Sequence, residues 1–101
     1  MDTKTLIAEA KARFNLNSAK AQLKDKYDGK LTVADQGGLW KADLPTINFL
    51  NSTDDDEIII IDSFKDPVKV NRLPLLNKLK ETYTLVMSDW YNELKELESK
   101  R

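Results

Sequence analysis

The sequence has 101 residues, of which 41% are hydrophobic and 33% are charged, a composition that suits one compact domain with a heavily charged surface. Its formal net charge is −1, so no overall field points to nucleic acid or to an anionic membrane. It contains no cysteine and no histidine, which excludes disulfides, zinc and haem sites of the usual kind, and Cys- or His-dependent catalysis.

The first part of the chain, residues 1–29, predicts a pair of short helices. Asp2 or Thr3 is suited to cap the first helix, and the polar stretch Asn15–Ser18 interrupts it and offers a cap for a second helix. Gly29 is expected to end the second helix as its C′ residue, because glycine adopts the left-handed conformation without steric cost. The apolar positions of the first helix recur at helical spacing: Leu6, Ile7, Ala10 and Phe14.

Residues 30–70 predict a β-rich part that contains two hairpins. From Lys30 the apolar residues alternate, and the pair Gly37-Gly38 separates two extended runs, which is typical of a β-hairpin. A short helix follows near residues 45–50, capped by Asp43. The four isoleucines from Ile58 to Ile61 predict a strand covered on both faces, paired with Val68–Val70. Two hairpins side by side would form an antiparallel sheet of about four strands.

Residues 71–100 predict one long amphipathic helix. Asn71 is suited to cap it, Pro74 falls in the first turn, and no glycine or further proline follows. One apolar stripe recurs along it at steps of three or four residues: Leu76, Leu79, Tyr83, Val86, Trp90, Leu94 and Leu97. We therefore predict a single α+β domain over residues 1–101, with a helical pair, a β-rich part and a long C-terminal helix.

The sequence offers little for catalysis, and we expect a non-enzymatic protein without a cofactor. Neither common phosphate-binding glycine loop is present. The acidic loop Asp54–Asp56 has the oxygen donors that a hard cation prefers, but it is more typical of a solvated loop that keeps an apolar strand soluble. Asp62 near Lys65 and Lys69 resembles the acid–lysine groups of metal nucleases only faintly, since no second acid shares its strand face.

The long helix is the favoured functional surface. It is long for so small a domain, and its apolar stripe would extend beyond the core that the rest of the chain can supply. We expect it to bind a protein partner or to pair with a second copy of the chain as a short coiled coil. The candidate interface residues are Val86, Met87, Trp90, Tyr91, Leu94 and Leu97.

A nucleic-acid-associated accessory protein is the alternative. Residues 1–30 carry seven Lys or Arg and four acids, a small basic excess. Trp40 beside Lys41 on a hairpin could stack on a base while the ammonium meets a phosphate. The phosphate-contact candidates on the N-terminal helices are Lys11, Arg13, Lys20, Lys24 and Lys26, although acids lie among them.

Two segments resemble small accessory or assembly proteins of T4-like tailed bacteriophages. They are the hairpin Gln36-Gly37-Gly38-Leu39-Trp40-Lys41 and the stretch Pro67-Val68-Lys69-Val70-Asn71-Arg72 before the long helix. The resemblance implies a phage-encoded protein that acts by binding, in the host cytoplasm or in virion assembly. Independently, the longest apolar run is far shorter than the ~20 residues of a membrane span. The first residues also lack the apolar core of a signal peptide, so we expect a cytoplasmic protein with no membrane partner.

Overall fold

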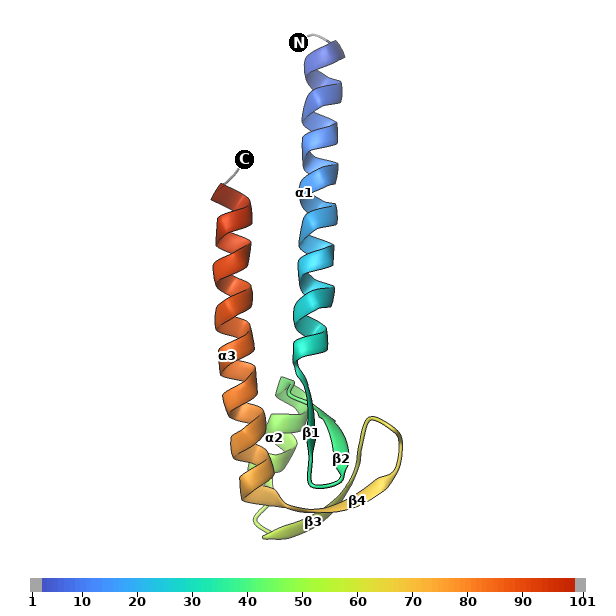
Figure 1. Cartoon of the computed structure of the whole chain (residues 1–101), viewed down its shortest axis with the longest axis vertical. Helices are drawn as coiled ribbons and strands as arrows, with labels where there is room; N and C mark the ends of the chain where they lie inside the picture. The colour runs from blue at the N-terminus through green and yellow to red at the C-terminus, as the bar shows by residue number, and fades with distance from the viewer. Residues whose placement is uncertain (1–2, 100–101) are drawn as a thin grey trace.

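A computed structural model describes the backbone of residues 3–99 and the side chains of residues 15–99. Two long helices run side by side in opposite directions, and the strands and a short helix form a base at one end (Figure 1). The α+β class and the long C-terminal helix are confirmed. In chain order the elements are α1 (Thr3–Lys30), β1 (Thr32–Asp35), β2 (Gly38–Lys41), α2 (Leu44–Ser52), β3 (Glu57–Ile61), β4 (Pro67–Asn71) and α3 (Arg72–Ser99).

The predicted pair of N-terminal helices is wrong, because α1 is one continuous helix of 28 residues. The stretch Asn15–Ser18 does not break it. Asparagine and serine cost at most ~0.7 kcal/mol each relative to alanine inside a helix, and no proline is present there. Gly29 is not a left-handed C′ residue, since it lies within α1 and Gly37 is the one glycine of the described chain with positive φ. The helix ends at Lys30, and the Leu31 N–H donates to the Tyr27 carbonyl at 3.1 Å.

The first hairpin is confirmed, and its turn explains why two glycines stand there. Strands β1 and β2 pair in antiparallel register, with Val33 opposite Trp40. The turn residues Gln36 and Gly37 have φ values of 50° and 78°, the signature of a type I′ turn. Gly38 serves a different purpose: a Cβ there would lie 2.5 Å from the Trp40 indole, so the missing side chain lets that ring pack.

The short helix α2 forms as its sequence predicts. The Asp43 carboxylate accepts a hydrogen bond from the Thr46 N–H at 3.1 Å, and Pro45 lies in the first turn. Ile47 and Leu50 are buried on the inner face of the helix. The Arg72 guanidinium donates to the Leu50 carbonyl at 3.1 Å, which joins the end of α2 to the start of α3.

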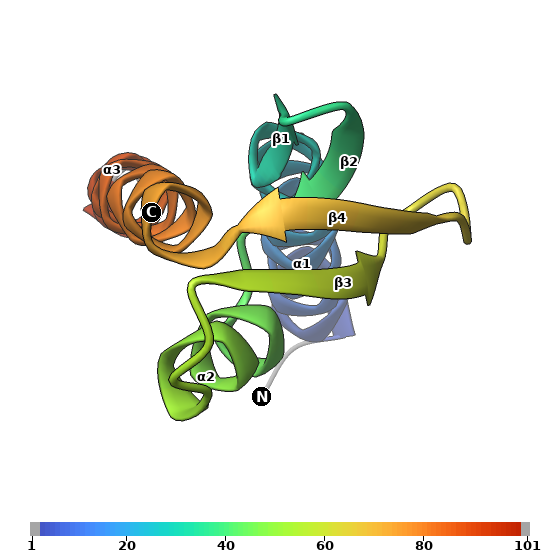
Figure 2. The same cartoon turned by 90° about the horizontal axis from the view of Figure 1, so that it is seen from below.

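The second hairpin is also present, but the predicted four-stranded sheet is wrong. The strands form two separate two-stranded antiparallel sheets, β1-β2 and β3-β4. The hairpins cross steeply (Figure 2), so the two sheets share no ladder, although the Ser63 N–H donates one backbone hydrogen bond to the Leu39 carbonyl at 2.8 Å. The Gln36 amide donates to the Asn71 carbonyl at 3.1 Å and accepts from the Asn71 N–H at 2.7 Å.

The isoleucine strand is covered on one face only, contrary to the prediction. Ile58 and Ile60 are half-buried and pack against the core, whereas Ile59 and Ile61 are 68% and 67% exposed. The two-stranded sheet has no layer over its outer face, because the remaining elements of the base pack on the inner one. Strand β3 therefore carries an apolar surface that the chain itself does not bury.

The core lies at the junction of the base with both long helices. It comprises Tyr27, Leu31, Val33, Trp40, Ala42, Ile47, Leu50, Val70, Leu75, Leu76, Leu79 and Val86. Beyond this junction only α1 and α3 continue, and the molecule measures 65 × 24 × 20 Å. Its radius of gyration is 19.3 Å, against about 13 Å for a compact chain of this length. The long helix thus lies along α1 and extends well beyond the sheets (Figure 1). In the part of the chain that the structure describes, no helix is long and apolar enough to cross a membrane.

Candidate protein interface

We call the part of α1 and α3 beyond the base the helical arm, and an aromatic pair fastens it. Tyr27 of α1 is buried, and its ring stacks on the Trp90 ring of α3 with centroids 6.1 Å apart and planes 8° apart. Leu23, one turn earlier on α1, packs against the same cluster. This pairing fixes which residues of α3 face α1 and which are left to face outward.

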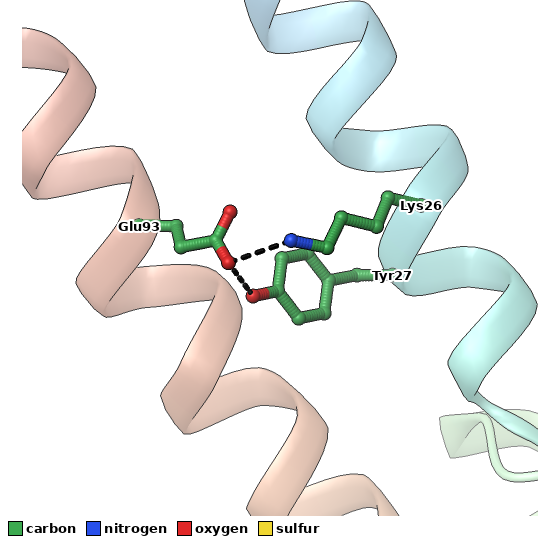
Figure 3. Close-up of polar contacts among 3 residues, drawn as sticks. All are labelled: Lys26, Tyr27 and Glu93. Atoms are coloured by element: carbon green, nitrogen blue, oxygen red, sulfur yellow. Dashed lines mark hydrogen bonds and ion pairs between the residues drawn. The ribbon is translucent and has the colours of Figure 1, made fainter.

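A polar group beside the aromatic pair sets the register of the two helices (Figure 3). One carboxylate oxygen of Glu93 accepts from the Lys26 ammonium at 2.7 Å and from the Tyr27 hydroxyl at 2.5 Å. The hydrogen bonds from Lys26 and then Tyr27 lower the pKa of Glu93. The hydrogen bond to Glu93 raises the pKa of both Lys26 and Tyr27. Because both charged side chains are partly exposed, this group specifies alignment more than it adds stability.

The six predicted interface residues fall on two different faces of α3. Val86, Trp90 and Leu97 lie on the side toward α1: Val86 belongs to the buried core, Trp90 stacks on Tyr27, and Leu97 lines a groove between the helices. The other three are spaced i, i+4 and i+7 and therefore share a flank of the helix that turns away from α1. We call this flank the outer stripe; it consists of Met87, Tyr91 and Leu94.

The outer stripe combines apolar character with exposure. Tyr91 is 60% exposed at its centre, and Met87 and Leu94 are half-buried. The Lys95 ammonium lies 5.4 Å from the centroid of the Tyr91 ring, so it covers one side of that ring. Spacing of i, i+4 and i+7 is that of a helix-packing seam. The stripe can therefore receive one further helix beside α3.

The groove on the opposite flank of the arm shows that α1 and α3 are not fully closed on each other. Its volume is about 410 Å³. The residues that line it are Ala19, Gln22, Leu23, Lys26, Glu93, Glu96 and Leu97. The groove therefore has a mixed polar and apolar lining, contributed by both helices of the arm.

Two of the residues predicted for nucleic-acid binding, Trp40 and Lys41, are already engaged by the chain itself. Trp40 is 2% exposed, and its indole N–H donates to the Asp35 carbonyl at 2.8 Å, so neither ring face is open to a base. The Lys41 ammonium is bound to the Asp28 carbonyl at 3.2 Å. Lys26 is paired with Glu93, Lys20 and Lys24 lie elsewhere on α1, and the side chains of Lys11 and Arg13 lie outside the described residues.

The acidic residues considered for metal binding or catalysis are Asp62, which holds the two hairpins together, and the exposed loop Asp54–Asp56. Asp62 is buried, and its carboxylate accepts from the backbone N–H groups of Leu39, Phe64 and Asp66 at 3.0 to 3.1 Å. Burial alone raises its pKa, but these hydrogen bonds outweigh that effect and lower it. Asp62 thus ties the second hairpin to the first at Leu39. The loop Asp54–Asp56 is exposed, and residues 15–99 contain no cluster of three or more acidic, cysteine or histidine side chains that could hold a metal ion.

Two contacts that shape the candidate interface and the base were not predicted from the sequence: the hydrogen bond from Tyr27 to Glu93 and the hydrogen bond from Leu39 to Asp62. Both join residues far apart in the chain, 66 and 23 positions respectively. The spacing of Leu23 and Tyr27 on one helix face was a local signal of the first contact; no local signal marked the second.

Comparisons with protein-family models, curated proteins and solved structures gave no match to this chain.

Proposed function

We propose that this chain is a non-enzymatic protein-association module and that the outer stripe of α3 binds a helix of a second copy. The observation that carries the proposal is the exposure of Tyr91, 60%, at the centre of a helix-packing seam. Exposed aromatic and methionine side chains are enriched at the centres of protein interfaces. The setting implied by the resemblance to tailed-phage proteins, an assembly or accessory factor in the host cytoplasm, is compatible with such a module.

Charge indicates which helix of the second copy lies on the stripe. Residues 85–99 of α3 carry four carboxylates and one lysine, whereas residues 3–20 of α1 carry four basic residues and one glutamate. Two α3 helices side by side would therefore repel each other, while α3 of one copy and α1 of the other would attract. We propose the second arrangement, in which two helical arms pack into a four-helix assembly.

Sedimentation equilibrium from about 1 µM to about 1 mM tests the proposal, a range that spans association free energies of about −8 to −4 kcal/mol. We expect a reversible dimer that weakens as salt increases, because unlike charges attract less when screened. Replacing Tyr91 and Leu94 together by glutamine should abolish it. The matched control is Leu85→Gln, also on α3 and 60% exposed but on the other flank, which should leave the dimer intact. A monomer throughout the range, or equal effects of both variants, would refute the proposal.

A further inference from the structure

The base carries a second apolar surface, separate from the helical arm, where β3 meets α2. Its most exposed side chains are Phe49, Ile59 and Ile61, at 54%, 68% and 67%. A groove of about 550 Å³ runs along this surface. Pro45, Thr46 and Phe49 of α2 line one side, β3 lines the other, and Leu39 and Lys41 of β2 reach in. We call the three exposed side chains the isoleucine patch.

The backbone of β3 along this groove is an open strand edge. Hydrogen bonds from Arg72 N–H to the Asp56 carbonyl and from Asp62 N–H to the Asp66 carbonyl bracket the β3-β4 ladder. Because hydrogen-bonded and non-hydrogen-bonded pairs alternate in an antiparallel ladder, the backbone N–H and C=O groups of Ile58 and Ile60 then point toward β4. The N–H and C=O groups of Ile59 and Ile61 point to the outer edge, where no hydrogen bond from another segment reaches them within residues 15–99.

Proteins that bind an extended segment as an added strand use two features: a strand edge with unpaired backbone groups, and an apolar surface beside it. The edge supplies alternating donors and acceptors, and Phe49 and the isoleucines supply contacts for every second side chain. A small molecule would leave the edge groups unpaired, and a helix could not satisfy them. The occupant that fits this geometry is an extended chain.

The charges around the outer edge of β3 indicate the composition of the segment that it can bind. Residues 54–69 carry six carboxylates and two lysines, a formal net charge of −4. Of the lysines, Lys69 is already paired with Glu57 at 3.1 Å. The Lys41 ammonium in the groove is held by the Asp28 carbonyl. A second copy would bring another −4 to the same place, which disfavours pairing of β3 with itself.

We propose that the outer edge of β3 binds an extended segment of a partner protein in which apolar residues alternate with lysine or arginine. The segment pairs with the backbone of Ile59 and Ile61 as a third strand of the β3-β4 sheet. Its apolar side chains cover the isoleucine patch, and its cations lie near the acidic loop Asp54–Asp56. The site is independent of the outer stripe on α3, so either can exist without the other.

A capped heptapeptide of alternating lysine and valine tests the proposal in an NMR titration of the full chain, with the glutamate–valine peptide as the charge control. We expect the cationic peptide to shift the amide signals of Ile59 and Ile61 and to slow their hydrogen exchange. Affinity should fall at least tenfold in high salt and should be at least tenfold lower for the acidic peptide. Shifts confined to the arm, equal binding of both peptides, or no binding would overturn the proposal.

Two variants separate edge pairing from general stickiness. Ile59→Pro removes the outward N–H without touching a bond to β4, and Ile59→Lys keeps that N–H but removes an apolar contact and adds repulsion. Both should weaken binding of the cationic peptide at least tenfold, whereas Leu85→Gln on α3 should not change it. The amide signals of Val33 and Trp40 in the same NMR spectra report whether each variant retains the folded base. Shifts at Ile59 and Ile61 that depend on protein concentration without any peptide would show self-pairing instead and overturn the proposal.

Discussion

Replacing Trp90 by alanine should loosen the helical arm and leave the base folded. A fully buried tryptophan costs ~3–5 kcal/mol when truncated to alanine. Trp90 is half-buried, which reduces this to about 2 kcal/mol, and losing its stack on Tyr27 adds ~0.5–1 kcal/mol. The sum, about 2.5–3 kcal/mol, is smaller than the ~5–15 kcal/mol that holds a domain of this size together. It should raise the population of the opened arm by roughly 70- to 160-fold.

Native-state hydrogen exchange measures this local opening. In the Trp90→Ala variant, amides of α1 around Leu23 should lose protection by roughly that factor, while amides of β2 and β4 should keep theirs. Leu85→Ala is the control, because Leu85 lies on the same helix and is 60% exposed, but belongs neither to the side toward α1 nor to the outer stripe, so it should leave α1 protected. An equal loss of protection in α1 and in the base would show instead that the arm and the base unfold as one unit, and that Trp90 does not stabilise the arm separately.

Three further results are expected. Gly29→Ala should raise the free energy of unfolding, measured in urea, by up to ~1 kcal/mol, because Gly29 is helical with open space around it. Gly38→Ala should lower it by ~1–3 kcal/mol, because the added methyl group would overlap the Trp40 ring. A loss of stability in both variants would contradict the helical position of Gly29. The fold lowers the pKa of Asp62 from 3.8, so its carboxylate stabilises the protein above that pH, and this stabilisation is lost as the pH falls through the pKa of the folded state. Asp62→Asn should therefore reduce the loss of stability at acid pH in urea unfolding measured from pH 2 to 7. In a gel-shift series at low salt we expect no complex with single- or double-stranded DNA, since Trp40 is buried; a complex with a steep salt dependence would favour the nucleic-acid alternative instead.

Local chemistry made most of the elements predictable. The Gly37-Gly38 pair indicated the first hairpin, Asp43 and Pro45 indicated the start of α2, and the long stretch without glycine or proline indicated α3. Each of these signals acts within a few residues and does not depend on the rest of the fold. The outer stripe was predicted in part for the same reason, because the periodic spacing of apolar residues in α3 can be recognised from that segment alone.

Polar residues misled the prediction of α1. Asn15, Asn17 and Ser18 favour helix ends, but they only weaken a helix interior, and nothing in their neighbourhood makes a turn obligatory. Sequence alone also gave no means of choosing between a C′ position and a helical position for Gly29. Only the tertiary packing of Tyr27 decides, since it holds the last turns of α1 against Trp90.

The pairing of distant elements could not be predicted because a few isolated contacts make it. The Gln36 amide, the Asp62 carboxylate and one backbone hydrogen bond from Ser63 to Leu39 join the two hairpins, where a four-stranded sheet would have used a continuous ladder. The division of the α3 residues into an inner and an outer face likewise depends on where α1 lies. That position follows from Tyr27 and Glu93, which are 66 residues apart.

Energy transfer between two copies measures whether α1 of one copy lies along the outer stripe of another. The natural chain has no cysteine, so a donor can be placed at Ser88→Cys on α3 and an acceptor at Ser18→Cys on α1 in separate preparations. On mixing, we expect transfer that rises with concentration, disappears with the Tyr91 and Leu94 glutamine variant, and is absent when the acceptor is at Ser63→Cys in the base. Transfer that is absent at concentrations where the chain sediments as a dimer would contradict this arrangement.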